Sequence, residues 1–187
     1  EHWWITSEYL YDPEEQLFYR DDRYFTRKTK NDQKVFWSRG NGWVMGGLVR
    51  VIPFIPTSHP LRARFVQQYK EMAAKIIQLQ GKDGLWRSSL LDADEYSVGE
   101  SSGTGFFVYA LAWGINEGIL PAAEYRMAVE KGWHGLVKNV NEDGRLGYVQ
   151  QVGHSPEAIS EDDWQVYGTG AFLLAGCEIL KMLRKNL

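Results

Sequence analysis

The feature that most constrains the fold is a glycine motif that occurs three times at nearly constant spacing. A Gly-x-Gly step lies in each of the segments 39–43, 102–106 and 167–171. The first glycines of the three copies (40, 103 and 168) are 63 and then 65 residues apart. Spacing of this kind indicates a repeated structural unit. An apolar run follows each copy, so each unit is expected to contain a helix directly after its glycines.

These apolar runs are predicted to form three inner helices, over Val44–Ile55, Phe107–Ile119 and Phe172–Leu183. After the first two runs, the segments Leu61–Leu79 and Ala122–Val140 place apolar or aromatic side chains three and four residues apart. That spacing is typical of an amphipathic helix with one buried face. Small residues along the inner helices would let them approach one another closely: Gly46, Gly47, Ala110, Ala112, Gly114, Ala175 and Gly176.

Turn residues separate the predicted helices. Asp-Gly pairs at 83–84 and 143–144 follow the two amphipathic segments and favour tight turns. Pro53 is predicted to kink or end its helix, whereas Pro60 and Pro121 suit the first turn of the next one. Strand signal is thin and is limited to short pairs near residues 17–19 and 85–88.

Each unit therefore consists of an aromatic loop, a Gly-x-Gly step, an inner helix and an outer amphipathic helix. Helix pairs of this kind cannot bury both faces alone and must stack on their neighbours. We predict an all-α fold, an α/α toroid of three helical hairpins at about 1–80, 81–140 and 141–187. Three pairs form an open half-ring, so residues 1–187 are expected to be a single partial domain. That domain would be half of an (α/α)6 barrel, with the missing N-terminal half upstream.

Composition and motifs exclude several classes of function. A net charge of −3 and a pI near 5.8 provide no basic field, so no nucleic-acid partner is expected. A single cysteine, Cys177, excludes an internal disulfide and says little about the compartment. No apolar run reaches the roughly 18 residues of a membrane span, so no membrane partner is expected. The four histidines are scattered and no Gly-x-Ser-x-Gly elbow occurs, which argues against a zinc site and a serine hydrolase triad.

The stretch with the strongest chemical signal is residues 35–43, Val-Phe-Trp-Ser-Arg-Gly-Asn-Gly-Trp. The indoles of Trp37 and Trp43 are suited to cover the apolar face of a sugar ring. Arg39 offers a planar fork of donors to a carboxylate. The alternative is that the two indoles fill the core and Arg39 is a surface charge. The glycines between them serve either helix packing or contact with a ligand.

Four motifs in the same order carry a resemblance to a known family. They are Trp-Ser-Arg-Gly-Asn-Gly-Trp at 37–43, Asp-Gly-Leu-Trp at 83–86, Glu-Ser-Ser-Gly-Thr-Gly at 100–105 and Gln-Val-Tyr-Gly-Thr-Gly at 165–170. With them the sequence resembles the unsaturated glycuronyl hydrolases, specifically the unsaturated rhamnogalacturonyl hydrolases of glycoside hydrolase families 105 and 88. The likeness covers nearly the whole chain, but only the C-terminal half of the usual family length.

The resemblance implies an (α/α)6 barrel without metal or cofactor, in a bacterial cytoplasm or periplasm. The implied substrate is an oligosaccharide with a Δ4,5-unsaturated uronate at its non-reducing end. An Asp would protonate C4 and water would add at C5, which needs a carboxyl group that holds a proton near neutrality. That Asp lies upstream of this chain in the family, so the catalytic residue here is unknown.

Carried over residue by residue, the resemblance places Trp37, Arg39 and Trp43 at the sugar site. The family tends to carry a His in the loop that here reads Leu-Phe-Tyr-Arg-Asp-Asp at 17–22. This chain has Arg20 near that place, which puts a His-assisted step in doubt. Arg20 either contacts a substrate anion or pairs with one of the neighbouring aspartates, Asp21 and Asp22. Those two carboxylates either polarise a water or are simply solvated.

Other candidates have equally plain alternatives. Trp86 and Arg87 follow an Asp-Gly turn, and either contact substrate or are buried. Glu100 is expected to touch sugar hydroxyls, and Ser101 or Ser102 to cap the following helix. Gln165 and Tyr167 precede the third Gly-x-Gly step, and the same two roles, helix capping or contact with sugar, are open for them. The predicted substrate-binding residues are Trp37, Arg39, Trp43, Arg20, Trp86, Glu100 and Ser102.

Two other functions fit the predicted architecture. One is another α/α-toroid carbohydrate enzyme, such as an ordinary glycosidase or a sugar epimerase, which needs an acid and a base from two loops. The other is a non-catalytic helical array that binds glycans.

Overall fold

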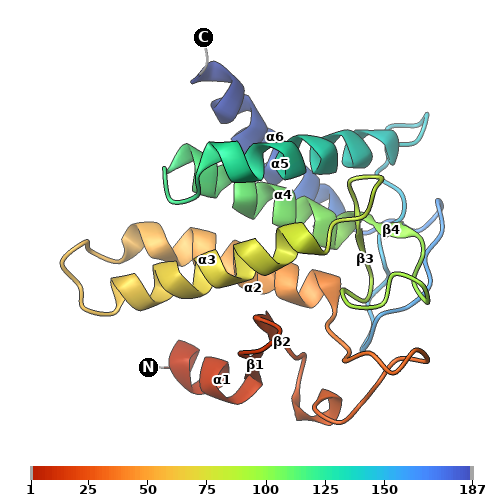
Figure 1. The fold of residues 1–187 in the computed structure, drawn as a ribbon. Coiled ribbons are helices and arrows are strands. Elements are labelled where there is room, and N and C mark those ends of the chain that lie inside the picture. Colours follow the sequence, from red (N-terminus) through yellow and green to blue (C-terminus); the bar gives the residue numbers. More distant parts are fainter. Residues whose placement is uncertain (1, 186–187) are drawn as a thin grey trace.

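The computed structural model describes residues 2–185. Within them the chain is mostly helical, with α1 His2–Leu10, α2 Ser38–Val51, α3 Arg62–Gln78, α4 Ser101–Asn116, α5 Ala122–Lys138 and α6 Val166–Arg184 (Figure 1). The predicted all-α class is confirmed. The amphipathic helices α3 and α5 agree closely with the predicted segments. Helix α1 was not predicted.

Short irregular elements connect the helices. Strand β1 (Tyr11–Asp12) pairs antiparallel with β2 (Leu17–Phe18), and β3 (Trp86–Arg87) pairs antiparallel with β4 (Gly99–Glu100). The two predicted strand regions are thus confirmed. Two 3₁₀ turns complete the set, η1 Asp22–Tyr24 and η2 Ile52–Phe54. Pro53 lies in η2, so α2 ends where this proline was predicted to end it.

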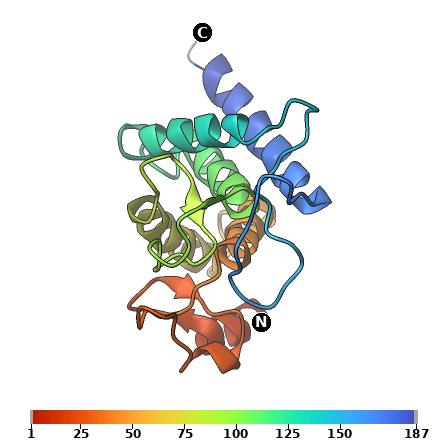
Figure 2. The same ribbon diagram turned by 90° about the vertical axis from the view of Figure 1, so that its right-hand side faces the viewer.

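The helices form two layers. In Figure 1, α3 and α5 lie in front, and α2, α4 and α6 lie behind them; Figure 2 shows the same layers from the side. Helix α4 is the centre of the inner layer, because nearly all of its residues are buried and it packs against α2, α5 and α6. A helix that is apolar all round requires neighbours on every side. The prediction of inner apolar helices backed by outer amphipathic ones is therefore confirmed.

The inner helices begin earlier than predicted. They start at Ser38, Ser101 and Val166, so the Gly-x-Gly steps lie inside their first turns and not in loops ahead of them. The reason is close packing between neighbouring inner helices. A Cβ added at Gly103 would lie 2.2 Å from Ser38 Oγ, and one added at Gly105 would lie 2.9 Å from the Ala171 Cβ. These two glycines therefore serve helix packing.

Short connections at 52–61 and 117–121 join α2 to α3 and α4 to α5, whereas the long loops 11–37, 79–100 and 139–165 precede α2, α4 and α6. These loops gather at one end of the helices, on the right in Figure 1. Helix α1 also packs on α3, because Trp3 Nε1 donates to Gln68 Oε1 at 2.8 Å and Trp3 and Trp4 both contact the Phe65 ring.

Helix α6 borders an open side of the molecule. Several of its large apolar side chains are exposed, among them Leu173, Leu180 and Leu183. By length and composition α6 is the one described helix that meets the criterion for a membrane span, although core helices of soluble proteins meet it too. An exposed apolar face of this kind is what an edge of a half-ring presents.

The two Asp-Gly turns allow a matched test of backbone packing. Gly84 and Gly144 both have positive φ, +87° and +83°. A Cβ at Gly84 would lie 2.2 Å from the carbonyl oxygen of Lys131 on α5, whereas a Cβ at Gly144 meets no atom within 4 Å. We expect Gly144→Ala to cost about 1 kcal/mol, for the left-handed backbone alone. Gly84→Ala should cost about 3 kcal/mol, because overpacking against a backbone atom is added.

Urea denaturation of the two variants measures this difference. Equal losses of unfolding free energy would show that the contact between the 81–84 turn and α5 relaxes without cost.

Candidate functional site

A pocket of about 380 Å³ lies between α1, β2 and the first turns of α2, and we call it the α1–α2 pocket. That volume falls in the range of small-ligand sites. Its wall is largely aromatic, built from Trp3, Phe18, Tyr19 and Trp37, and Arg20 lies at its edge. Among the described residues that line it, Arg20 is the one Arg or Lys. Of the predicted substrate-binding residues, the structure brings Trp37 and Arg20 to this pocket.

The Trp37 indole is held from two sides. Its Nε1 donates to Gln150 Oε1 at 2.9 Å. The Arg39 guanidinium lies 4.4 Å from the Trp37 ring and 4.7 Å from the ring of Tyr167 on α6. A cation between two aromatic faces is attracted to both. The first turn of α2 is thereby joined to the first turn of α6 and to the 139–165 loop.

Arg39 is buried, with 4% of its surface exposed, so the alternative of a surface charge is wrong. Its Nη1 donates to the Gln150 carbonyl at 2.6 Å and its Nη2 to the Gln151 carbonyl at 2.9 Å. The Tyr167 hydroxyl donates to the same Gln150 carbonyl at 2.6 Å. Burial raises the pKa of this hydroxyl, and the nearby Arg39 charge works in the opposite direction. The predicted fork of Arg39 thus engages two backbone carbonyls.

Glu100 is completely buried at the start of α4. Its Oε1 accepts from the Ser102 amide at 3.0 Å, the Ser102 hydroxyl at 2.6 Å and the Gln150 amide at 3.0 Å. Its Oε2 accepts from the Gly103 amide at 2.6 Å. Glu100 is therefore the residue that caps α4, and the prediction of Ser101 or Ser102 as the cap is corrected. Glu100 is the last residue of strand β4, and its side chain is long enough to reach the free amides in the first turn of α4.

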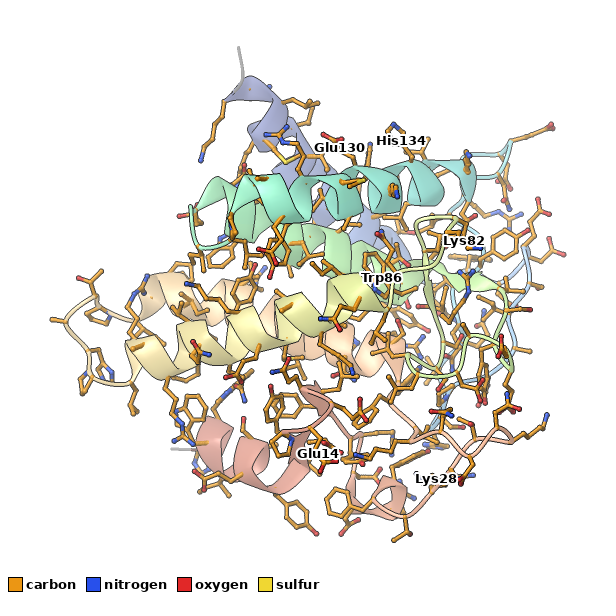
Figure 3. All side chains as sticks on the ribbon, in the orientation of Figure 1. Glu14, Lys28, Lys82, Trp86, Glu130 and His134 are labelled. Atoms are coloured by element: carbon orange, nitrogen blue, oxygen red, sulfur yellow. The ribbon has the colours of Figure 1, made fainter. Side chains whose placement is uncertain are left out.

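Three predicted contact residues do not reach the surface. Trp86, labelled in Figure 3, is fully buried. It donates from Nε1 to the Ile76 carbonyl at 2.7 Å and packs on Phe107. Glu100 and Ser102 have no exposed surface either, and their polar atoms bond to one another. We therefore correct the expectation that these three side chains touch sugar. Their polar groups find hydrogen-bond partners inside the protein, so we assign these three side chains a structural role.

Trp43 is separated from Trp37. It is 53% exposed, its ring centroid lies 4.3 Å from that of Phe106 on α4, and it does not line the α1–α2 pocket. The two indoles of the motif therefore do not share one wall.

The sequence did not single out Gln150, although it is the most connected residue of this region. It is buried, and its side chain accepts from Trp37 and donates to the Ser155 carbonyl at 2.7 Å. Its backbone amide donates to Glu100 Oε1, and its carbonyl accepts from Arg39 and Tyr167. It thus links the starts of all three inner helices. No local signal marks it, because three of its partners, Trp37, Arg39 and Glu100, come from other hairpins.

Arg20 lies where two loops meet. Its Nη1 pairs with Asp21, and its Nη2 lies 3.3 Å from Nδ1 of His154 in the 139–165 loop. Asp21 Oδ2 also accepts a hydrogen bond from Arg23 Nη2 at 2.8 Å, so it forms an ion pair with both arginines. Hydrogen bonds from Arg23, with a smaller contribution from Arg20, hold the pKa of Asp21 well below its usual range. The expected pairing of Arg20 with a neighbouring aspartate is thus present.

Two further observations describe the chemistry near the pocket. Burial, followed by a hydrogen bond to Asp12, raises the pKa of the Tyr19 hydroxyl to about 12, so it stays protonated at neutral pH. Across residues 2–185, no group of three or more His, Cys, Asp or Glu side chains is arranged to hold a metal ion.

Residues 1–183 match the family model described as Glycosyl Hydrolase Family 88. The chain is 50% identical over 183 residues to an unsaturated 3S-rhamnoglycuronyl hydrolase of Formosa agariphila. It is 46% identical over 177 residues to a protein of the same name from an Alteromonas species. Each alignment covers 95% of this chain, but only 48% and 43% of the relatives. The chain thus spans about half the length of the curated relatives it matches.

Among solved structures, a glycosyl hydrolase family 88 protein from Bacteroides vulgatus superposes with a TM-score of 0.92 at 36% identity. The superposition covers 96% of this chain and 53% of that one. The fold described above is therefore half of the α/α toroid of these proteins, as the sequence predicted.

Proposed function

The chain belongs to glycosyl hydrolase family 88, and from this premise we propose that the whole protein is a glycoside hydrolase that removes a Δ4,5-unsaturated uronate from the non-reducing end of an oligosaccharide. The observation that carries the proposal is the family match over residues 1–183, which includes the aromatic pocket around Trp37. The two curated relatives suggest the substrate class. The substrate that we propose is an oligosaccharide in which the unsaturated uronate is linked to rhamnose, because both relatives are named 3S-rhamnoglycuronyl hydrolases.

In this proposal the uronate ring lies against the Trp37 indole in the α1–α2 pocket. A C4=C5 double bond flattens the ring, and a flat apolar face stacks well on an indole. Arg39 fixes the tilt of that indole from behind and adds a positive charge close to the site of the carboxylate. Trp43, which is exposed on α2, remains a candidate for contact with a second sugar.

The proposed reaction is hydration of the enol-ether double bond. A carboxyl group adds its proton to C4, and a water molecule adds its oxygen to C5 and returns a proton to the carboxylate. The resulting hemiketal opens: C5 becomes a ketone, its bond to the ring oxygen breaks, and the ring oxygen takes a proton and becomes a hydroxyl group on C1. The hemiacetal now present at C1 collapses to an aldehyde, and the neighbouring sugar leaves as an alcohol with the proton of that hydroxyl group. One carboxyl group that alternates as acid and base is sufficient. The resemblance places this group upstream of the present chain, and the chain alone is expected to show no turnover.

The test is the ultraviolet absorbance of the conjugated double bond. We expect the full-length protein to abolish it in an unsaturated glycuronyl-rhamnose disaccharide. A disaccharide in which the double bond has been reduced is the control, and no sugar should be released from it. Persistent absorbance with the full-length protein would overturn the proposal, and tight binding without turnover would instead indicate a glycan-binding array.

A further inference from the structure

Asn41, the middle residue of the first Gly-x-Gly step, joins two parts of the wall of the α1–α2 pocket. It is buried, with 1% of its surface exposed, and it does not line the pocket itself. Its Oδ1 accepts from the Phe18 amide at 2.8 Å, and its Nδ2 donates to the Phe18 carbonyl at 3.0 Å. Nδ2 also donates to the Trp37 carbonyl at 3.1 Å. One carboxamide therefore ties the backbone of β2 to the backbone of Trp37.

An asparagine side chain is suited to this position because its amide carries the donor and the acceptor of a peptide group. Strand β2 pairs with β1, and Asn41 meets the N–H and C=O of Phe18 as a second neighbouring strand would. Phe18 is buried, so without Asn41 its backbone groups would lack partners in a region closed to solvent. An alanine at this position offers neither a donor nor an acceptor, and an ionised aspartate offers no donor.

The first turn of α2 is the fixed side of this link. A Cβ added at Gly42 would lie 2.9 Å from the Cβ of Phe106 on α4, so the two helices are closely packed there. The bonds from Arg39 to the 139–165 loop hold the same turn from another side. Since these contacts do not involve Asn41, the loss of its carboxamide would release the β2 side of the link and leave α2 in place.

The β2 side of the link carries three pocket residues in a row. Residues 18–20 all line the α1–α2 pocket, and we call them the 18–20 wall. In the described part of the chain, the hydrogen bonds between this wall and α2 are the two made by the Asn41 carboxamide. Other contacts of the wall lie within the loops, such as the bond from the Tyr19 hydroxyl to Asp12 at 3.0 Å. Asn41 therefore decides how far the 18–20 wall stands from the α2 side of the pocket.

We propose that Asn41 is a positioning residue, which sets the spacing between the 18–20 wall and the Trp37 indole and thereby the fit of the uronate ring. The inference deepens the proposed function and rests on it, because the spacing affects activity only if a sugar ring enters this pocket. A gap of about 1 Å forfeits about half of a dispersion contact, so a wall that moves away loses its hold on the ring. The wall contacts the ring before and during the reaction, so its displacement weakens binding more than the chemical step.

The experiment replaces Asn41 in the full-length protein and measures kcat and KM on the unsaturated disaccharide. Asn41→Ala should raise KM about tenfold, the equivalent of one lost interaction, while kcat stays within about twofold. Asn41→Asp keeps the acceptor for the Phe18 amide but loses both donors, and should raise KM as well. This second variant should fold, because a carboxylate is favourable in the first turn of a helix.

Asn116→Ala is the matched control. Asn116 is buried at the end of α4, and its Nδ2 donates to the carbonyl of Glu178 at 2.9 Å and to Oε2 of the same residue at 2.8 Å. It does not line the α1–α2 pocket. This variant should lose stability in urea denaturation, as Asn41→Ala does, but keep both kinetic constants of the wild type.

Equal kinetic losses in Asn41→Ala and Asn116→Ala would overturn the inference, because they would trace to stability alone. An unchanged KM in both Asn41 variants, or a loss confined to kcat, would overturn it as well. If the wild-type protein does not turn over the unsaturated disaccharide, the proposed function fails instead. Amide hydrogen exchange then decides the positioning role separately. Exchange at residues 17–20 that is about tenfold faster in Asn41→Ala but not in Asn116→Ala supports it, and equal exchange in the two variants overturns it.

Discussion

Replacing Glu100 with alanine is expected to lower the free energy of unfolding by about 4 kcal/mol. The buried carboxylate accepts from four donors, three backbone amides and the Ser102 hydroxyl. Alanine would leave these donors without a partner in a region closed to solvent, and it would also remove the cap of α4. The loss should appear as a lower midpoint in urea denaturation with an unchanged slope.

Two variants control this result. Glu100→Gln keeps the shape and one acceptor oxygen, and should lose about half as much stability. Glu117 ends the same helix but is exposed, so Glu117→Ala should stay within about 0.5 kcal/mol of the wild type. A loss below about 1 kcal/mol for Glu100→Ala would mean that water enters and replaces the carboxylate.

Arg39→Ala is expected to lower kcat/KM about 100-fold in the full-length protein. The side chain fixes the Trp37 indole and two carbonyls of the 139–165 loop, so its removal would displace the proposed sugar platform without touching the reacting atoms. Stability should fall too, by about 3 kcal/mol, because two buried carbonyls lose charged donors. Steady-state kinetics on the unsaturated disaccharide and urea denaturation measure the two effects.

Arg39→Lys separates charge from shape. Lysine keeps the positive charge but cannot reach both carbonyls with a rigid fork or stack as a plane between two rings, so most of the loss should remain. Arg50 lies in the last turn of the same helix and is exposed, and Arg50→Ala should leave both measurements unchanged. An Arg39→Ala protein with wild-type kinetics would show that the position of Trp37 does not depend on this contact.

The fold was largely readable from local patterns. Periodic apolar side chains gave α3 and α5 almost to the residue, because the period of a helix is a property of a short segment. The Asp-Gly turns, Pro53 and the two short strand pairs are local signals of the same kind. The repeated glycines pointed to a ring of helices because one spacing recurs along the whole chain.

The site was readable only in part. The motif at 37–43 pointed to Trp37 and the resemblance pointed to Arg20, and both side chains line the α1–α2 pocket, while their contact with a sugar stays a prediction. Burial of Trp86 was left open, since its neighbour Phe107 and its acceptor Ile76 come from separate helices. His154 appeared in the sequence as one of four scattered histidines, and only the folded loops bring it to Arg20.

The sequence by itself determined five of the six described helices, the repeat and the family, because each of these depends on residue order within one segment or on motifs in series. The tertiary structure alone decided where the inner helices begin, which residue caps α4 and which side chains meet at the pocket. The physical reason is that these outcomes depend on contacts between hairpins. Arg39 reaches Gln150 across 111 residues, and Glu100 reaches it across 50, so no local pattern records either contact.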